Sequence, residues 1–170
     1  MKKSIPLVLA FLFIAGVVCA ADPVEGYWLS VDEKTGKVTA GWYIYQQGGK
    51  LFGKIMSLAD VEPTALAKDC KESYAGFPIA GRVNKMPIVG SPWIYGLSMD
   101  KPGAWSGGKI IDPSDGAEWN CKIIFHPANG KEYKIDTLQM RGSGFMGIGR
   151  SQYWRKSDQV TASSLRPPAK

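Results

Sequence analysis

Short runs of apolar and aromatic residues alternate with clusters of turn residues along most of the chain. The turn clusters are rich in glycine, and sequences such as Gln47-Gly48-Gly49-Lys50 are typical of hairpins because glycine accepts a positive φ. This spacing predicts β-strands joined mostly by tight turns. The predicted strands are residues 27–31, 38–46, 51–58, 93–99, 104–111, 117–125, 132–140 and 145–155.

The run at 117–125 shows the clearest alternation. Trp119, Cys121, Ile123 and Phe125 fall on one face, while the residues between them are polar. This strand is therefore expected to place its apolar face, including Cys121, against the core.

Two segments lack the strand rhythm. Residues 59–92 form a long connection with room for a short helix at Thr64–Lys68, directly after Pro63. Residues 157–170 are polar with two prolines and are expected to form a flexible C-terminal tail.

Eight sequential antiparallel strands favour an all-β fold that closes into an up-and-down barrel, with a two-sheet sandwich as the alternative. The composition fits one globular domain, with 45% hydrophobic and 11% aromatic residues. The 20 glycines of the 170 residues match a small barrel, which needs turns and bends.

The N-terminus has the pattern of a secretory signal peptide. Lys2 and Lys3 precede a mostly apolar stretch up to Val18, and Ala20 fits the cleavage position. We therefore expect a signal peptide at 1–20, a barrel domain at 21–156 and export to the periplasm or the medium. A lipid anchor on Cys19 and an uncleaved anchor are less favoured alternatives.

Removal of this segment changes the charge. Loss of two lysines leaves 19 basic and 15 acidic residues, a net +4 instead of +6. The basic residues are scattered, whereas nucleic-acid binding needs a basic stripe. We expect neither a nucleic-acid partner nor a transmembrane segment in the mature chain.

Two cysteines remain after cleavage. Cys70 and Cys121 are predicted to form a disulfide in an oxidising compartment, with two separate buried thiols as the alternative. Such a bridge would stabilise the fold by roughly 4 kcal/mol.

A motif at each end of the predicted barrel resembles the calycin, or lipocalin-like, pattern. Gly26-Tyr27-Trp28 is a G-x-W motif on the first strand, and Arg150 and Arg155 lie on the last. The resemblance implies that Trp28 packs across the barrel base against a late arginine, where a guanidinium stacks on the indole.

The chain also resembles a family of small secreted bacterial proteins of unknown function that is placed with the calycins. The matching segments include 51–55, the Cys70 region through Gly90, Trp105–Pro113 and Gly149–Arg155. The resemblance implies a barrel and export, and it brings no established activity.

Candidate catalytic and metal groups are few. His126 is the only histidine and precedes Pro127, which suits a turn residue better than a general base, and it cannot supply a zinc site. Gly142–Gly147 matches G-x-G-x-x-G without the strand–helix context of a nucleotide site, and Asp112–Gly116 suits a turn. We predict no catalytic residue, metal or cofactor.

The aromatic residues are the best functional lead. The chain has six tryptophans, and residues 38–46 carry aromatic side chains on both faces. The leading hypothesis is an exported non-enzymatic barrel that binds a small apolar ligand, envelope lipid or partner protein. The alternatives are a small hydrolase with Asp or Glu at the barrel mouth and a filled-core structural module. The residues predicted to line or rim the site are Trp42, Tyr43, Tyr45, Trp93 and Trp105.

Overall fold

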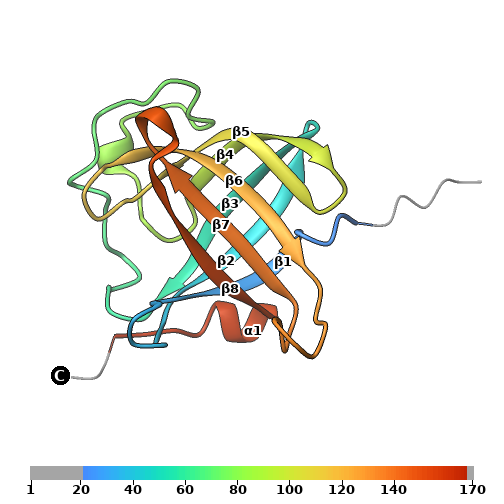
Figure 1. The fold of residues 1–170 in the computed structure, drawn as a ribbon. Helices are drawn as coiled ribbons and strands as arrows, with labels where there is room; N and C mark the ends of the chain where they lie inside the picture. The colour runs from blue at the N-terminus through green and yellow to red at the C-terminus, as the bar shows by residue number, and fades with distance from the viewer. Residues whose placement is uncertain (1–20, 168–170) are drawn as a thin grey trace, which may run out of the picture.

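The computed structural model describes residues 21–167 and shows a closed barrel of eight antiparallel strands (Figure 1). Each strand pairs with the next in sequence, and β8 pairs with β1. The predicted up-and-down barrel is confirmed, and the sandwich is excluded. The predicted signal peptide at 1–20 lies outside the described residues. The strands are β1 (Gly26–Val31), β2 (Val38–Gln47), β3 (Lys50–Leu58), β4 (Pro92–Lys101), β5 (Ala104–Ile111), β6 (Glu118–His126), β7 (Thr137–Ser143) and β8 (Gly149–Ser157).

The core lies inside the barrel and follows the alternation of the strands. On β6, Cys121 and Ile123 are 2% and 0% exposed, as the sequence pattern predicted. Their neighbours Asn120 and Lys122 point outward and are exposed. The interior is thus built from alternate residues of all eight strands.

Glycine allows the wall of the barrel to bend at β3. A Cβ on Gly53 would lie only 2.7 Å from Cδ1 of Ile44 and 3.1 Å from Cβ of Ile94. The β3–β4 register shifts on both sides of Gly53. The missing side chain lets the two strands approach closely at this bend.

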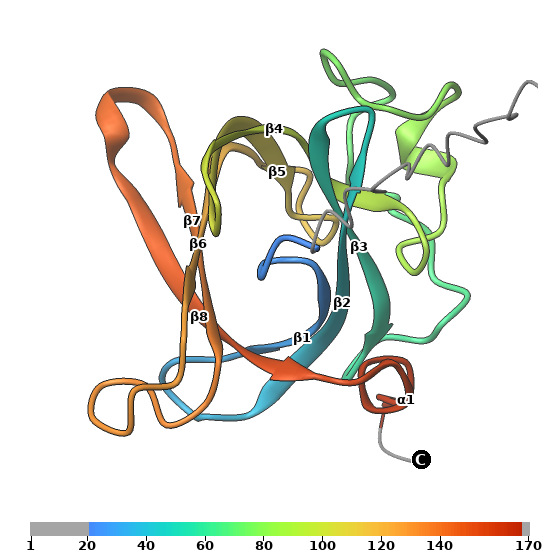
Figure 2. The same ribbon diagram turned by 90° about the vertical axis from the view of Figure 1, so that its right-hand side faces the viewer.

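One end of the barrel, here the closed end, is covered by the segment before β1. The Trp28 indole donates a hydrogen bond to the Val24 carbonyl at 2.8 Å, and the Gly103 amide donates to the Asp22 carboxylate at 3.0 Å. Trp28 is fully buried beneath this segment. Figure 2 shows the N-terminal segment curling within the barrel outline.

The cation over Trp28 is Lys156, whose Nζ lies 4.4 Å from the ring centroid and donates to the Glu25 carbonyl at 2.8 Å. The expected role of Arg150 or Arg155 in this contact was therefore wrong. Arg155 has the outward parity of its strand, and Arg150 lies at the other end of β8. Gly26 pairs with Ile44 next to this closure, and a Cβ there would lie 3.0 Å from the Lys156 amine.

The long connection between β3 and β4 packs on the outside of the barrel. Its middle is held by paired backbone groups: Ala67 donates to Met86, and Ile88 donates to Ala65. These partners replace helical bonds, so the helix predicted at Thr64–Lys68 is absent, and only a 3₁₀ turn, η1 (Val83–Lys85), forms.

Residues 157–162, at the start of the segment expected to form a flexible tail, are ordered. Ser157 ends β8, and α1 (Gln159–Ala162) follows, capped by the Asp158 side chain, which accepts from the Thr161 amide. The Ser57 hydroxyl donates to the Ala162 carbonyl at 2.7 Å. This contact ties α1 to the outer face of the barrel.

The predicted disulfide is absent, because Cys70 and Cys121 are both free thiols. Cys70 lies on the connection beside Gly116, where an added Cβ would be 2.9 Å from the Cys70 Cα. Cys121 is inside the barrel, five residues after Gly116. The extended stretch of β6 from Glu118 to Cys121 by itself spans roughly 10 Å. A disulfide requires Cα atoms within about 7 Å. The alternative of two separate buried thiols describes the structure.

Candidate functional site

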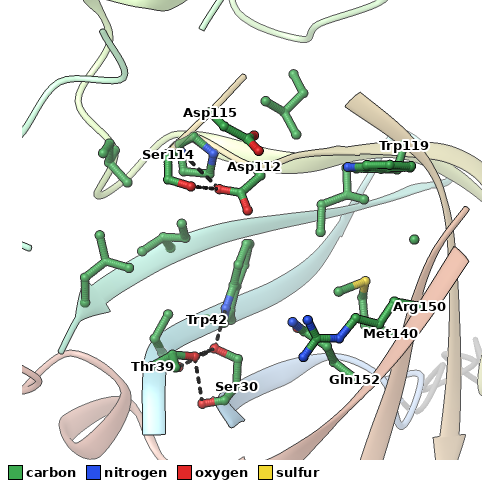
Figure 3. A pocket seen from close by; sticks show the side chains of 18 of the residues that line it. Ser30, Thr39, Trp42, Asp112, Ser114, Asp115, Trp119, Met140, Arg150 and Gln152 are labelled. Atoms are coloured by element: carbon green, nitrogen blue, oxygen red, sulfur yellow. Dashed lines mark hydrogen bonds between the residues drawn. The ribbon is translucent and has the colours of Figure 1, made fainter. Parts of the chain in front are cut away.

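A cavity of about 820 Å³ opens at the end of the barrel opposite the closed end, here the open end (Figure 3). Its lining includes residues of the β3–β4, β5–β6 and β7–β8 connections, such as Asp60, Asp112 and Ile148, together with parts of the strands. Its main apolar lining residues are Ala40, Trp42, Ile55, Leu58, Val61, Ile88, Ile110, Ile111, Trp119, Met140, Ile148 and Trp154.

Two stacked tryptophans form part of the apolar lining. The rings of Trp42 and Trp154 lie 4.8 Å apart at an interplanar angle of 23°. The Trp42 indole donates to the Ser30 hydroxyl at 3.3 Å, and the Trp154 indole donates to the Gln152 side chain at 3.0 Å. Because both N–H groups have partners, the pair presents hydrocarbon to the cavity.

The half of the barrel nearer the closed end is filled by side chains. The side chains that fill it belong to residues that are no more than 1% exposed and do not line the cavity. A filled half and a hollow half therefore divide the interior. The filling residues include Trp28, Ile44, Leu51, Leu97, Trp105, Ile123 and Leu138.

Gly142 on β7 lines the cavity between Trp119 and Ile110. A Cβ on Gly142 would make ordinary contacts with Trp119 at 3.6 Å and with Ile110 at 3.8 Å. Trp119 is 42% exposed at the mouth, so its ring forms part of the rim.

The rim is polar and carries both signs of charge. Asp112 accepts hydrogen bonds from the Ser114 amide at 2.9 Å and from its hydroxyl at 2.6 Å. Arg150 lies across the mouth, with its Nε 3.8 Å from the Glu33 carboxylate. Asp60 and Asp115 complete the charged lining, and all of these groups face solvent. The site can therefore enclose an apolar body and contact a polar group at its mouth.

Comparison with known proteins places the fold. Residues 26–156 match the family described as "Uncharacterized protein conserved in bacteria (DUF2147)". The chain belongs to this family. No curated protein matches its sequence.

A solved structure is similar to the DUF2147 barrel over nearly its whole length. It is protein HP1028 from the human pathogen Helicobacter pylori, described as belonging to the lipocalin family. The TM-score is 0.62 at 14% identity, covering 84% of this chain and 89% of that one. This likeness confirms the predicted calycin-like barrel.

Of the five aromatic residues predicted for the site, only Trp42 lines the cavity. Tyr43 and Tyr45 stack on each other on the outer face, with centroids 5.4 Å apart. The fully buried Trp93 donates from its indole to the Ile88 carbonyl at 2.7 Å and packs beside Phe77 of the connection. Trp105 belongs to the filled half. The structure therefore does not bring these five residues together.

The lining residues that sequence reasoning missed are mostly aliphatic. Ile55, Ile110 and Met140 share the inward parity of Trp42, since cross-strand partners on adjoining strands face the same side. The sequence did indicate that these residues face inward near the open end of the barrel. Inward-facing residues can also fill the interior, so this pattern alone does not predict a cavity.

His126 lies outside the cavity. Its ring stacks on Tyr133 with centroids 4.6 Å apart, and its Nε2 is 3.0 Å from the Gln139 side-chain oxygen. Within residues 21–167, no group of three or more His, Cys, Asp or Glu side chains is arranged to hold a metal. No helix in the described part of the chain is long and apolar enough to span a membrane.

Proposed function

We propose that this DUF2147 protein is an exported binding protein that holds a small, mainly apolar ligand in the open-end cavity. The cavity inside the barrel carries the proposal, because about 820 Å³ lies within the range of small-molecule sites. The similarity to a lipocalin-family protein supports a fold that can enclose a ligand. The signal-like residues 1–20 support export.

The lining favours a ligand with an apolar body and one polar end. The Trp42–Trp154 pair and the aliphatic lining residues offer hydrocarbon contacts to a ligand inside the cavity. Charged and hydroxyl groups occur at the rim, where they keep contact with water. A fatty acyl chain or an envelope lipid has this distribution of polarity.

The cavity also weighs against the other two functions considered. A filled-core structural module would have side chains where the hollow half lies. A hydrolase of the kind considered would place its catalytic carboxylates in a pocket sheltered from water, whereas Asp60, Asp112 and Asp115 are exposed at the rim.

The first test is native mass spectrometry of protein purified from the compartment to which it is exported. A reproducible small molecule that co-purifies and extracts into organic solvent supports the proposal. Purified protein is then titrated with the apolar fluorophore N-phenyl-1-naphthylamine, and fatty acids of increasing length compete with it.

A matched pair of variants places the binding in the cavity. Ile110→Trp adds volume to the cavity wall, while Lys109→Trp adds the same ring to the outer face one residue earlier on β5. We expect Ile110→Trp to weaken probe binding at least tenfold and Lys109→Trp to leave it within twofold. Equal affinities in the two variants, or no binding by the wild type, would contradict the proposal.

A further inference from the structure

The tip of the β7–β8 hairpin exposes large apolar side chains. Met146 is 82% exposed and Ile148 is 76% exposed. Val160 on α1 is the one other large apolar residue with more than three-quarters of its surface exposed in the described part of the chain, and it stands alone. The hairpin projects from the barrel at the open end, as both ribbon views show (Figures 1 and 2).

The tip is built to hold this outward position. Met146 has a φ of 60°, a left-handed conformation that non-glycine residues rarely adopt. The Arg141 guanidinium donates to the Gly147 carbonyl at 3.0 Å, which fixes the turn to β7. A Cβ on Gly144 would lie 3.1 Å from the Trp119 ring, so that partly exposed indole extends the apolar surface. We call Trp119, Met146 and Ile148 the apolar tip.

The hairpin below this tip is purely basic. Residues 137–157 contain no acidic residue, and two of their four basic residues, Arg141 and Arg150, lie in the half of the hairpin next to the tip. Arg155 and Lys156 lie at the closed end. An apolar tip above arginines suits a lipid surface, because the apolar side chains enter the acyl boundary while the cations remain among the phosphates. Tryptophan prefers the same interfacial depth.

We propose that the apolar tip docks the protein on a phospholipid bilayer with the cavity mouth turned towards the membrane. Ile148 belongs to both surfaces, since it lines the cavity and forms part of the tip. Docking through this hairpin therefore brings the mouth against the lipid from which an apolar ligand would enter. The docking surface stands independently of whether the cavity is filled.

Acidic groups at the same end limit the strength of this contact. Glu33, Asp60, Asp112 and Asp115 surround the mouth behind the hairpin. Anionic lipids attract the hairpin and repel this rim. The inferred contact is accordingly reversible and confined to the hairpin.

Flotation of the mature protein with vesicles tests the inference. The vesicles are pure phosphatidylcholine and phosphatidylcholine with 30% phosphatidylglycerol, at low salt and at high salt. We expect binding to the anionic vesicles, weaker binding to the neutral ones, and partial release by salt. A wild-type protein that binds neither vesicle would overturn the inference.

The variant Met146→Asn/Ile148→Ser removes the two most exposed side chains of the apolar tip and retains Trp119. Asparagine tolerates the left-handed backbone of position 146, so the turn is retained. We expect its vesicle affinity to fall at least tenfold, with circular dichroism and melting temperature unchanged. Val160→Ser is the control: it removes an equally exposed apolar group from α1, which lies far from the hairpin in both views (Figures 1 and 2).

Two other outcomes separate this inference from its alternatives. Equal vesicle binding by the tip variant and the wild type would contradict the inference and indicate a contact elsewhere on the surface. Binding of the Ile110→Trp variant to vesicles with wild-type affinity supports docking even if that variant no longer binds the fluorophore. Failure of docking and failure of ligand binding are thus distinguished.

Discussion

At the scale of single residues, the contact around Trp28 shows how close sequence reasoning can come and where it stops. The G-x-W motif led us to expect Trp28 at the barrel closure; Trp28 is fully buried next to β8, and a cation lies over its ring. The cation is Lys156 and not its neighbour Arg155, because strand parity turns 155 outward. A shift of one residue in the β1–β8 register decides which basic residue lies over Trp28. The G-x-W motif does not specify that register.

The lysine gives a prediction for stability. Lys156→Met removes both the charge over Trp28 and the hydrogen bond to the Glu25 carbonyl. We expect the free energy of unfolding in urea to fall by about 1 kcal/mol. Arg155→Met, the same change one position earlier, should alter it by less than about 0.5 kcal/mol. A larger loss in the Arg155 variant would show that the arginine has the closing role.

The candidate site shows a second limit at this scale. Trp42 was predicted for the site and lines the cavity, but β2 carries aromatic residues on both faces, and Tyr43 and Tyr45 face out. Their apolar surface is satisfied by stacking: Tyr43 packs on Tyr27, and Tyr45 on Phe52. Aromatic content does not distinguish such a stack from a binding surface, because both bury ring area.

At the scale of elements, strands were predictable and docked segments were not. The boundaries of β2, β3 and β5 agree with the pattern within one residue, because alternation and turn glycines specify them locally. The predicted strand at 132–140 begins only at Thr137, since residues 127–136 form a loop. The helix α1 escaped prediction because its stability comes from distant partners on β2 and β3.

Gly41 provides the test of how α1 is held. A Cβ at this position would lie 1.8 Å from the Ala162 carbonyl oxygen, so Gly41→Ala cannot coexist with docked α1. We expect amide hydrogen exchange across 159–165 to accelerate at least tenfold, which corresponds to about 1.4 kcal/mol. Exchange in β8 should stay slow.

The matched control for this prediction is Gly142→Ala on β7. Its Cβ makes only ordinary contacts of 3.6 Å and longer. It should leave exchange in α1 unchanged. Slow exchange of α1 in the Gly41 variant would mean that β2 itself shifts to accommodate the methyl group.

At the scale of the whole molecule, the barrel was predictable because each hairpin is a local feature and closure follows from their number and order. The cavity was not, because it is the space left between inward side chains contributed by many strands. Whether a mid-barrel position is filled depends on the volumes of residues such as Met140, Ile55 and Gly142 together. No single segment of the sequence determines the combined volume of these side chains.

The pH dependence of stability is also a property of the whole fold. Burial raises the pKa of Tyr95 well above its usual value, and the hydrogen bond from its hydroxyl to the Glu118 carboxylate at 2.6 Å acts in the same direction. Burial also raises the pKa of Tyr45 and of Tyr74. The folded state therefore keeps phenol protons that the unfolded chain releases above about pH 10. Stability is present below that pH and is lost as the pH rises further.

Tyr95→Phe isolates one of these groups. At neutral pH the variant should lose about 1 kcal/mol with the hydrogen bond to Glu118. Above pH 10 its free energy of unfolding should decline less steeply than that of the wild type, by up to about 1.4 kcal/mol per pH unit. Urea unfolding at pH 7, 10 and 11 measures both effects.

The segment over Trp28 has a practical consequence for attachment. Ala21 and Asp22 enter the fold at the end of the barrel opposite the mouth, where Asp22 is bound to Gly103. A linker joined at residue 21 therefore leaves from the far end and does not cross the opening. Protein that starts at residue 21 and is immobilised there would present the mouth and the β7–β8 hairpin to solution, so a sensor surface made this way can measure binding of ligands and of vesicles on the same molecules.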